Sequence, residues 1–236
     1  MIVLGVVALI IIGAALGHTQ QKKRQQALRE WAASLGLIFS EGKERGFDAR
    51  FPEFACFRNG EKRYAQNITE GHFEGRWVCA FDYHYQTTST RTVTDSKGRT
   101  RTKRQTNHHH FSAVILEPNV QLKELFIRPE GLFDKVASFF GKNDLDFGSA
   151  AFSRRYHVTA PDRRWAYDVL HARAIEYLLT VPTCTIQFAP KRVLILHGQS
   201  RLDAEAFHAA LKTVDTLLDM LPDYIREQQR LAPEIS

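Results

Sequence analysis

Apolar residues dominate the N-terminus of this chain of 236 residues. Residues 1–21 carry no charged side chain, and residues 2–16 are almost wholly Ile, Val, Leu, Ala and Gly. A helix of that length spans roughly 32 Å, which matches a hydrocarbon core of about 30 Å. We therefore predict a transmembrane anchor over residues 1–21. A juxtamembrane helix is predicted over 22–36, because Leu28, Trp31 and Leu35 recur at helical spacing.

Two other interpretations of the N-terminus stay open. A cleaved secretory signal normally begins with a positive region, whereas this apolar run begins at residue 2. A buried core helix would be expected to keep a polar face over its turns. Lys22, Lys23 and Arg24 follow the apolar run, and positive residues that flank a spanning helix stay on the cytoplasmic side. The anchor interpretation predicts a single-pass protein of the cell membrane, with its N-terminus outside and its domain in the cytoplasm.

Alternating hydrophobic positions predict strands in the rest of the chain. The clearest strand covers residues 76–85, where large apolar side chains occupy every second position. Thr-rich and Arg-rich segments flank a Ser-Lys-Gly turn, which predicts a long hairpin at about residues 86–110. A second hairpin is predicted over 183–196. Helical periodicity predicts one helix from 162 to 179 and another that begins at Asp203 and ends near residue 221.

These elements predict an α+β fold. The N-terminal transmembrane helix would be followed by a two-layer domain over residues 37–222, with antiparallel strands and helices packed on one side, and by a polar tail over 223–236. About two hundred residues suit one domain that folds without disulfides or metals. Cys56, Cys79 and Cys184 are far apart and lack CxxC spacing, which indicates buried thiols and not a disulfide or zinc site.

Short motifs along the chain resemble those of a bacterial protein family. They are Phe81-Asp82-Tyr83-His84-Tyr85, then Phe-Ile-Arg-Pro-Glu-Gly at 126–131, Asp-Leu-Asp-Phe at 144–147 and Phe-Ser-Arg-Arg-Tyr at 152–156. Together with the apolar N-terminus and the Thr-rich hairpin, their order resembles that of membrane-anchored proteins whose function is not established. The resemblance covers nearly the whole chain. It implies an N-terminal transmembrane helix plus one α+β domain, and it carries no catalytic residues.

Positive charge is concentrated in the predicted hairpin. The chain has a net charge of +6 and a pI near 9.3, and residues 86–110 alone contribute +5. The cations there are Arg91, Lys97, Arg99, Arg101, Lys103 and Arg104. A local basic feature on a nearly neutral body indicates a site. It predicts an interaction module that binds a protein partner or anionic lipid, whereas the other interpretation is a solvated, variable loop. Nucleic acid is not favoured, because the tip lacks aromatic residues for base stacking.

Three histidines suggest an alternative function. Imidazole is a common ligand of zinc, copper and nickel. In a strand, His108 and His110 share a face, and His84 can lie opposite them on the partner strand. A metal-binding protein or enzyme that uses these residues is therefore the alternative to an interaction module, and a polar strand end is the plain structural interpretation. The chain contains no Gly-rich phosphate loop, GxSxG or HExxH motif. The sequence thus indicates no catalytic residue, no cofactor and no small-molecule substrate, and it favours a protein that is not an enzyme.

Overall fold

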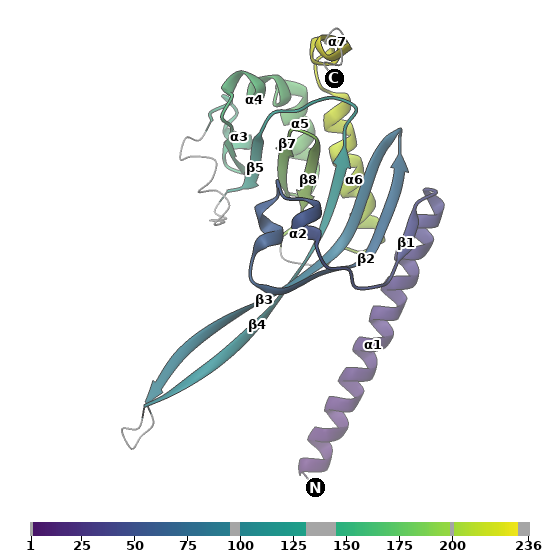
Figure 1. Ribbon diagram of the computed structural model, residues 1–236, viewed down its shortest axis with the longest axis vertical. Coiled ribbons are helices and arrows are strands. Elements are labelled where there is room, and N and C mark those ends of the chain that lie inside the picture. The colour runs from purple at the N-terminus through teal and green to yellow at the C-terminus, as the bar shows by residue number, and fades with distance from the viewer. Residues whose placement is uncertain (1, 95–99, 131–144, 199–200, 231–236) are drawn as a thin grey trace.

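A computed structural model describes residues 2–94, 100–130, 145–198 and 201–230. Within these ranges, side chains are described at all positions except residues 2–16, 94, 226 and 228–230. Within these residues, eight strands form one antiparallel sheet in the order β1-β2-β3-β4-β8-β7-β5-β6 (Figure 1). The strands are β1 (Ile38–Ser40), β2 (Glu61–Phe73), β3 (Arg76–Thr94), β4 (Thr100–Glu117), β5 (Leu125–Pro129), β6 (Tyr156–Thr159), β7 (Thr185–Ala189) and β8 (Arg192–Leu196).

Helices cover both faces of this sheet. They are α1 (Ile2–Ser34), α2 (Phe47–Arg50), the 3-10 helix η1 (Ala55–Arg58), α3 (Ala150–Ser153), α4 (Arg163–Val169), α5 (Ala172–Thr180), α6 (Ala204–Asp219) and α7 (Asp223–Arg230). One hydrophobic core joins α1 and α6 to Val78 and Ala80 of β3, and a second joins α2 and η1 to Cys79 and Phe81. These residues alternate along β3 and therefore point to opposite faces. The expected two-layer domain with helices on one side is wrong, because β3 is apolar on both faces and each face needs a cover.

The N-terminal helix also differs from the expectation. Among the side chains that the structure describes, no helix combines the length and apolar character needed to cross a membrane. The described residues therefore contradict the expected transmembrane, single-pass helix. The described part of α1 buries Leu28 and Trp31 in the core of the domain, with Trp31 stacked on Phe207 of α6 at 5.7 Å between ring centroids. Its charged residue Arg24, expected to flank the membrane, forms an ion pair with Asp82 of the sheet.

The core beneath α2 and η1 is built from aromatic side chains. Phe57 is fully buried and lies 5.0 Å from Tyr83 and 5.5 Å from Phe81 between ring centroids. The Tyr83 hydroxyl donates a hydrogen bond of 2.7 Å to the Phe57 carbonyl. Gly60 follows with φ of 61°, and a Cβ there would lie 2.2 Å from the Gln86 carbonyl oxygen. The chain can therefore turn into β2 at this closeness to β3 only with glycine.

Strands β3 and β4 form the long hairpin that the sequence predicted. Their ladder is continuous from Trp77 opposite Glu117 to Thr94 opposite Thr100. Strand β2 accompanies β3 as far as Gln86. We call the part from there inward, residues 76–86 and 108–117, the inner half. The remaining residues, 87–94 and 100–107, form the outer arms, which extend beyond the rest of the sheet as a two-stranded ribbon (Figure 1).

The C-terminal elements follow the sequence prediction with two differences. The hairpin of β7 and β8 forms as expected, and Asp203 caps α6 by accepting a 2.8 Å hydrogen bond from the Ala206 amide. The single helix expected over 162–179 is divided into α4 and α5, because Leu170 leaves helical geometry and His171 has an extended backbone. The segment expected to be a polar tail begins with α7.

Candidate functional site

A buried carboxylate lies in the inner half of the hairpin. Asp82 of β3 is 1% exposed, and Arg24 of α1 donates two hydrogen bonds to it, at 2.7 and 2.9 Å. The Ser112 hydroxyl of β4 donates at 2.6 Å and the Asn67 amide of β2 at 2.8 Å. Both carboxylate oxygens therefore accept two hydrogen bonds each, and the guanidinium binds in the two-pronged geometry that gives strong pairs. These bonds compensate the cost of burying the charge.

The same network fixes α1 and the segment before α6 to the sheet. The Leu202 carbonyl accepts a 2.8 Å hydrogen bond from Arg24 Nε, and the Leu202 amide donates to the Ser112 hydroxyl at 2.9 Å. Gln25 of α1 donates to the Asn67 side chain at 3.0 Å. Asn67 has a positive φ of 51° within an irregularity of the β2–β3 pairing, which turns its side chain toward Asp82. The inner half of the hairpin, which we also call its root, is thus held by α1, by β2 and by the segment before α6.

The next positions outward on this face are histidines. The structure brings together His84, His108 and His110, with His84 Nε2 lying 3.2 Å from His108 Nδ1 and the His84 and His110 rings 4.7 Å apart. Within the described residues, no group of three or more His, Cys, Asp or Glu side chains is arranged to hold a metal ion. Metal binding by these histidines stays a prediction.

Burial and neighbouring charges disfavour the protonated forms of His84 and His110. Burial first, and then Arg201, lower the pKa of His110 to about 4. Arg201 Nη2 lies 3.0 Å from His110 Nδ1, so the neutral ring accepts this hydrogen bond. Burial is also the main cause that lowers the pKa of His84, and His108 and Lys43 add to it. The face beside the hairpin root therefore presents the neutral imidazoles of His84 and His110 within a positive field.

A hollow of about 520 Å³ opens beside the histidines. Its lining residues are Lys43, Arg45, Lys62, Tyr64, His84, Gln86 and His108, and we call it the basic pocket. None of them is acidic. The Lys43 ammonium lies 4.5 Å from the centroid of the Tyr64 ring, and Tyr64 stacks on His84 at 4.5 Å. Positive charge is thus gathered over an aromatic and imidazole floor.

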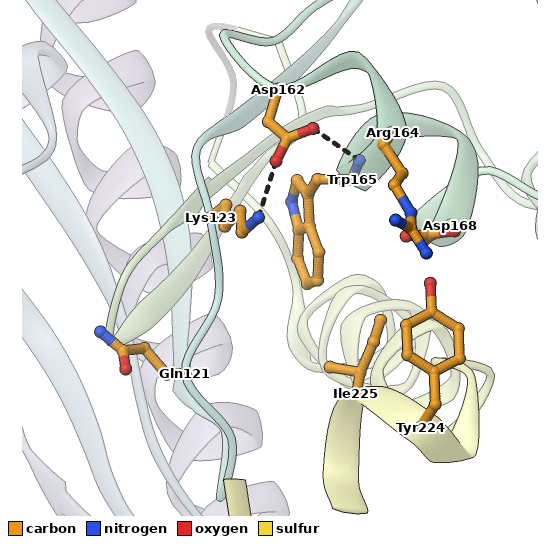
Figure 2. Close-up of a pocket in the computed structure, with 8 residues that line it drawn as sticks. All are labelled: Gln121, Lys123, Asp162, Arg164, Trp165, Asp168, Tyr224 and Ile225. Carbon is orange, nitrogen blue, oxygen red and sulfur yellow. Dashed lines mark hydrogen bonds and ion pairs between the residues drawn. The ribbon is translucent and has the colours of Figure 1, made fainter. Parts of the chain in front are cut away.

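A second hollow, of about 210 Å³, lies between α4 and α7 and contrasts with the basic pocket (Figure 2). Here the cations have carboxylate neighbours. Lys123 forms a 2.7 Å ion pair with Asp162, which also caps α4 by accepting from the Trp165 amide. A hydrogen bond to Asp168 raises the pKa of Tyr224, which faces the Arg164 and Asp168 side chains across the hollow. Residues of both charges line this hollow, whereas no acidic residue lines the basic pocket.

The outer arms carry the described part of the basic cluster. Arg91 lies directly opposite Lys103, and Arg101 lies opposite Val93. Because side chains alternate, Arg91, Arg101 and Lys103 share one face, and Arg104 lies on the other. Lys97 and Arg99 lie outside the described residues. Like charges directly opposite each other destabilise a ladder, so the Arg91–Lys103 pair does not serve stability.

Comparisons with known proteins show that the fold is similar to a solved structure, but they do not show a family for this chain. No protein family matches the chain, and no curated protein matches it. The fold is similar to the crystal structure of the mycobacterial trehalose monomycolate transport factor A, TtfA, with a TM-score of 0.57 and 17% sequence identity. The match covers 84% of this chain and 96% of that chain. At this identity the likeness shows the fold alone, which is an α+β domain also found in a bacterial protein. The family to which the motifs pointed is not confirmed.

Proposed function

We propose that this chain is a non-enzymatic interaction module that binds an acidic partner surface through the outer arms of the β3–β4 hairpin. The observation that carries the proposal is the shared face of Arg91, Arg101 and Lys103, all of them exposed. The outer arms contain no Asp or Glu. Because like charges on one ribbon repel, the arrangement favours a partner that supplies carboxylates or other anions.

The anchoring of the hairpin supports this function. Its inner half is hydrogen-bonded to β2 on one side and to β8 on the other, and Asp82 ties it to Arg24 of α1. A ribbon held firmly at its root loses less freedom on binding than a free loop, so more of the interaction energy is available for affinity. Charge on the exposed arms also accelerates encounter with an oppositely charged surface.

The likeness in fold to a transport factor suggests the cellular process in which this chain acts. We extend the proposal to an accessory role in a transport complex, in which the module contacts an acidic surface of another component and performs no chemistry. The absence of nucleophile motifs in the sequence agrees with that role.

Metal binding is the second candidate, because the three histidines gather on one face. Metal analysis of the purified protein tests it. About one equivalent of zinc, nickel or copper that is lost in His84→Ala would support it, and less than about a tenth of an equivalent would exclude it.

Affinity purification with matched variants tests the interaction module. The arm variant carries Arg91→Gln, Arg101→Gln and Lys103→Gln. The control variant carries Arg154→Gln, Arg163→Gln and Arg173→Gln, which removes three exposed cations near α3, α4 and α5. We expect a partner that is recovered with the unaltered chain and the control and lost with the arm variant. Equal recovery with all three proteins would overturn the proposal.

A further inference from the structure

The basic pocket lies at the root of the hairpin and uses residues other than those of the outer arms. Two of its cations come from the segment between β1 and α2, where Glu44 pairs with Ala65 of β2 through two backbone hydrogen bonds of 2.8 Å. In such an extended segment, alternate residues point to opposite sides. Lys43 and Arg45 therefore lie on one side, and Glu44 lies on the other.

Two carboxylates close to these cations in sequence, Glu44 and Asp48, have other partners. Glu44 Oε1 lies 3.9 Å from Arg50, and Asp48 forms a 2.9 Å ion pair with Arg63. Within the described part of the chain, no carboxylate forms an ion pair with Lys43, Arg45 or Lys62. Three cations therefore face one hollow whose lining contains no carboxylate, whereas Asp48 and Glu61 line the adjoining hollow.

The third cation is positioned by an irregular backbone. Lys62 has a positive φ of 49° and lies in a shift of the β2–β3 register between Glu61 and Tyr64. Such bulges redirect side chains and are common beside binding sites. A positive φ is unfavourable for lysine, so the surrounding structure must stabilise the backbone conformation that brings this side chain to the pocket.

The floor of the pocket offers hydrogen-bonding groups. His84 is 3% exposed, and its Nδ1 lies 3.4 Å from the Lys62 carbonyl oxygen, which is longer than a good hydrogen bond. Gln86 Nε2 lies at a similarly long 3.4 Å from His108 Nδ1. A ligand with several acceptor oxygens can receive better bonds from these groups than they make with each other.

We propose that the basic pocket binds a phosphate group, either free or as part of a phosphate-bearing lipid headgroup. Phosphate presents acceptor oxygens on every side, and Arg45 can bind two of them while Lys43 and Lys62 supply charge. A hollow of about 520 Å³ has room for the phosphate and a small attached group. The site goes beyond the proposed interaction module, because it needs neither of the outer arms.

Calorimetric titration of the full chain with inorganic phosphate tests this site. We expect a Kd below about 1 mM at low salt, weakened at least tenfold in a Lys43→Gln/Lys62→Gln variant. A Lys22→Gln/Lys191→Gln control removes two other exposed lysines and should bind as tightly as the unaltered chain. No binding at 10 mM phosphate, which is about ten times that Kd, or equal affinity in both variants, would overturn the proposal.

Two further experiments identify the source of the phosphate and separate this site from the hairpin. Short-chain phosphatidic acid that binds at least tenfold tighter than phosphate, with phosphatidylcholine of the same chain length inactive, would assign a lipid headgroup. Affinities equal to that of phosphate would assign the free ion. The arm variant Arg91→Gln/Arg101→Gln/Lys103→Gln should keep its phosphate affinity, so the two proposals can fail independently.

Discussion

The inner half and the outer arms of the β3–β4 hairpin share one backbone ladder but differ in everything around it. The inner half is covered on both faces, with Tyr83 packed under η1 and Asp82 bonded to α1. The outer arms are exposed on both faces and alternate threonine with cations. A lone two-stranded ribbon is at best marginally stable, so the arms depend on the inner half for their order. The comparison teaches that flanking contacts, and not strand pairing, determine which residues of one ladder are buried in the fold and which stay exposed.

Phe57→Ala should give the largest effect. This ring is fully buried against Phe81 and Tyr83, and its removal should lower the free energy of unfolding by about 3–5 kcal/mol. Val93→Ala in the outer arms, where the side chain is 45% exposed, is the matched truncation and should change little. Urea unfolding measures both. Similar losses of unfolding free energy in the two variants would contradict the distinction between the buried inner half and the exposed outer arms.

Arg24→Met should give the next largest effect. It leaves the Asp82 carboxylate buried without its cation, and removing one partner of such a pair typically costs about 3–5 kcal/mol. Asn67 and Ser112 still donate to Asp82, which favours the lower end of that range. In a double-mutant cycle, adding Asp82→Asn should restore part of the loss. Strictly additive losses in urea unfolding would show that the pair does not couple α1 to the hairpin.

Acid should weaken the root of the hairpin through His110. Its pKa is about 4 in the folded chain and near 6.5 when unfolded, so the unfolded chain binds the proton first as pH falls. Titration of His110 therefore does not lower the free energy of unfolding above about pH 6.5, and it lowers this free energy progressively as the pH falls toward 4. Because the ring is only partly buried, we expect a loss on the order of 1 kcal/mol. The difference in stability between the unaltered chain and His110→Gln should shrink over this range, and a constant difference would refute the assignment.

The arm variant Arg91→Gln/Arg101→Gln/Lys103→Gln should give the smallest effect on stability. These side chains are exposed, so the change in unfolding free energy should stay within about 0.5 kcal/mol. Relief of the repulsion between Arg91 and Lys103 should make it a slight gain. A loss above about 1 kcal/mol would mean that the cations contribute to the fold.

Alternation along the sequence was enough to predict the hairpin and the common face of the histidines. Both follow from local geometry, because antiparallel strands joined by a turn have a defined register. The cap at Asp203 was predictable for the same reason, since its partner Ala206 is three residues away.

Long-range partners could not be predicted in this way. An apolar run followed by Lys22, Lys23 and Arg24 is the usual pattern of a membrane anchor, and nothing local shows that Arg24 pairs with Asp82. Asp82 held a clue, because a carboxylate within an apolar strand needs a buried partner.

The cations of the basic pocket were missed because they come from different elements. The alternation of Lys43, Glu44 and Arg45 was a usable local signal, since it puts two cations on one side of an extended segment. The arrival of Lys62 beside them depends on the bulge in β2, which the sequence pattern does not reveal.

Site-specific photo-crosslinking tests most directly whether binding belongs to the outer arms. A photoreactive residue replaces Val93 on the arms or Ile38 on β1, which are large hydrophobic residues with exposures of 45% and 77%. We predict a partner crosslink from position 93 that disappears in the arm variant, and none from position 38. Equal yields from the two positions, or a crosslink that survives removal of Arg91, Arg101 and Lys103, would contradict the account.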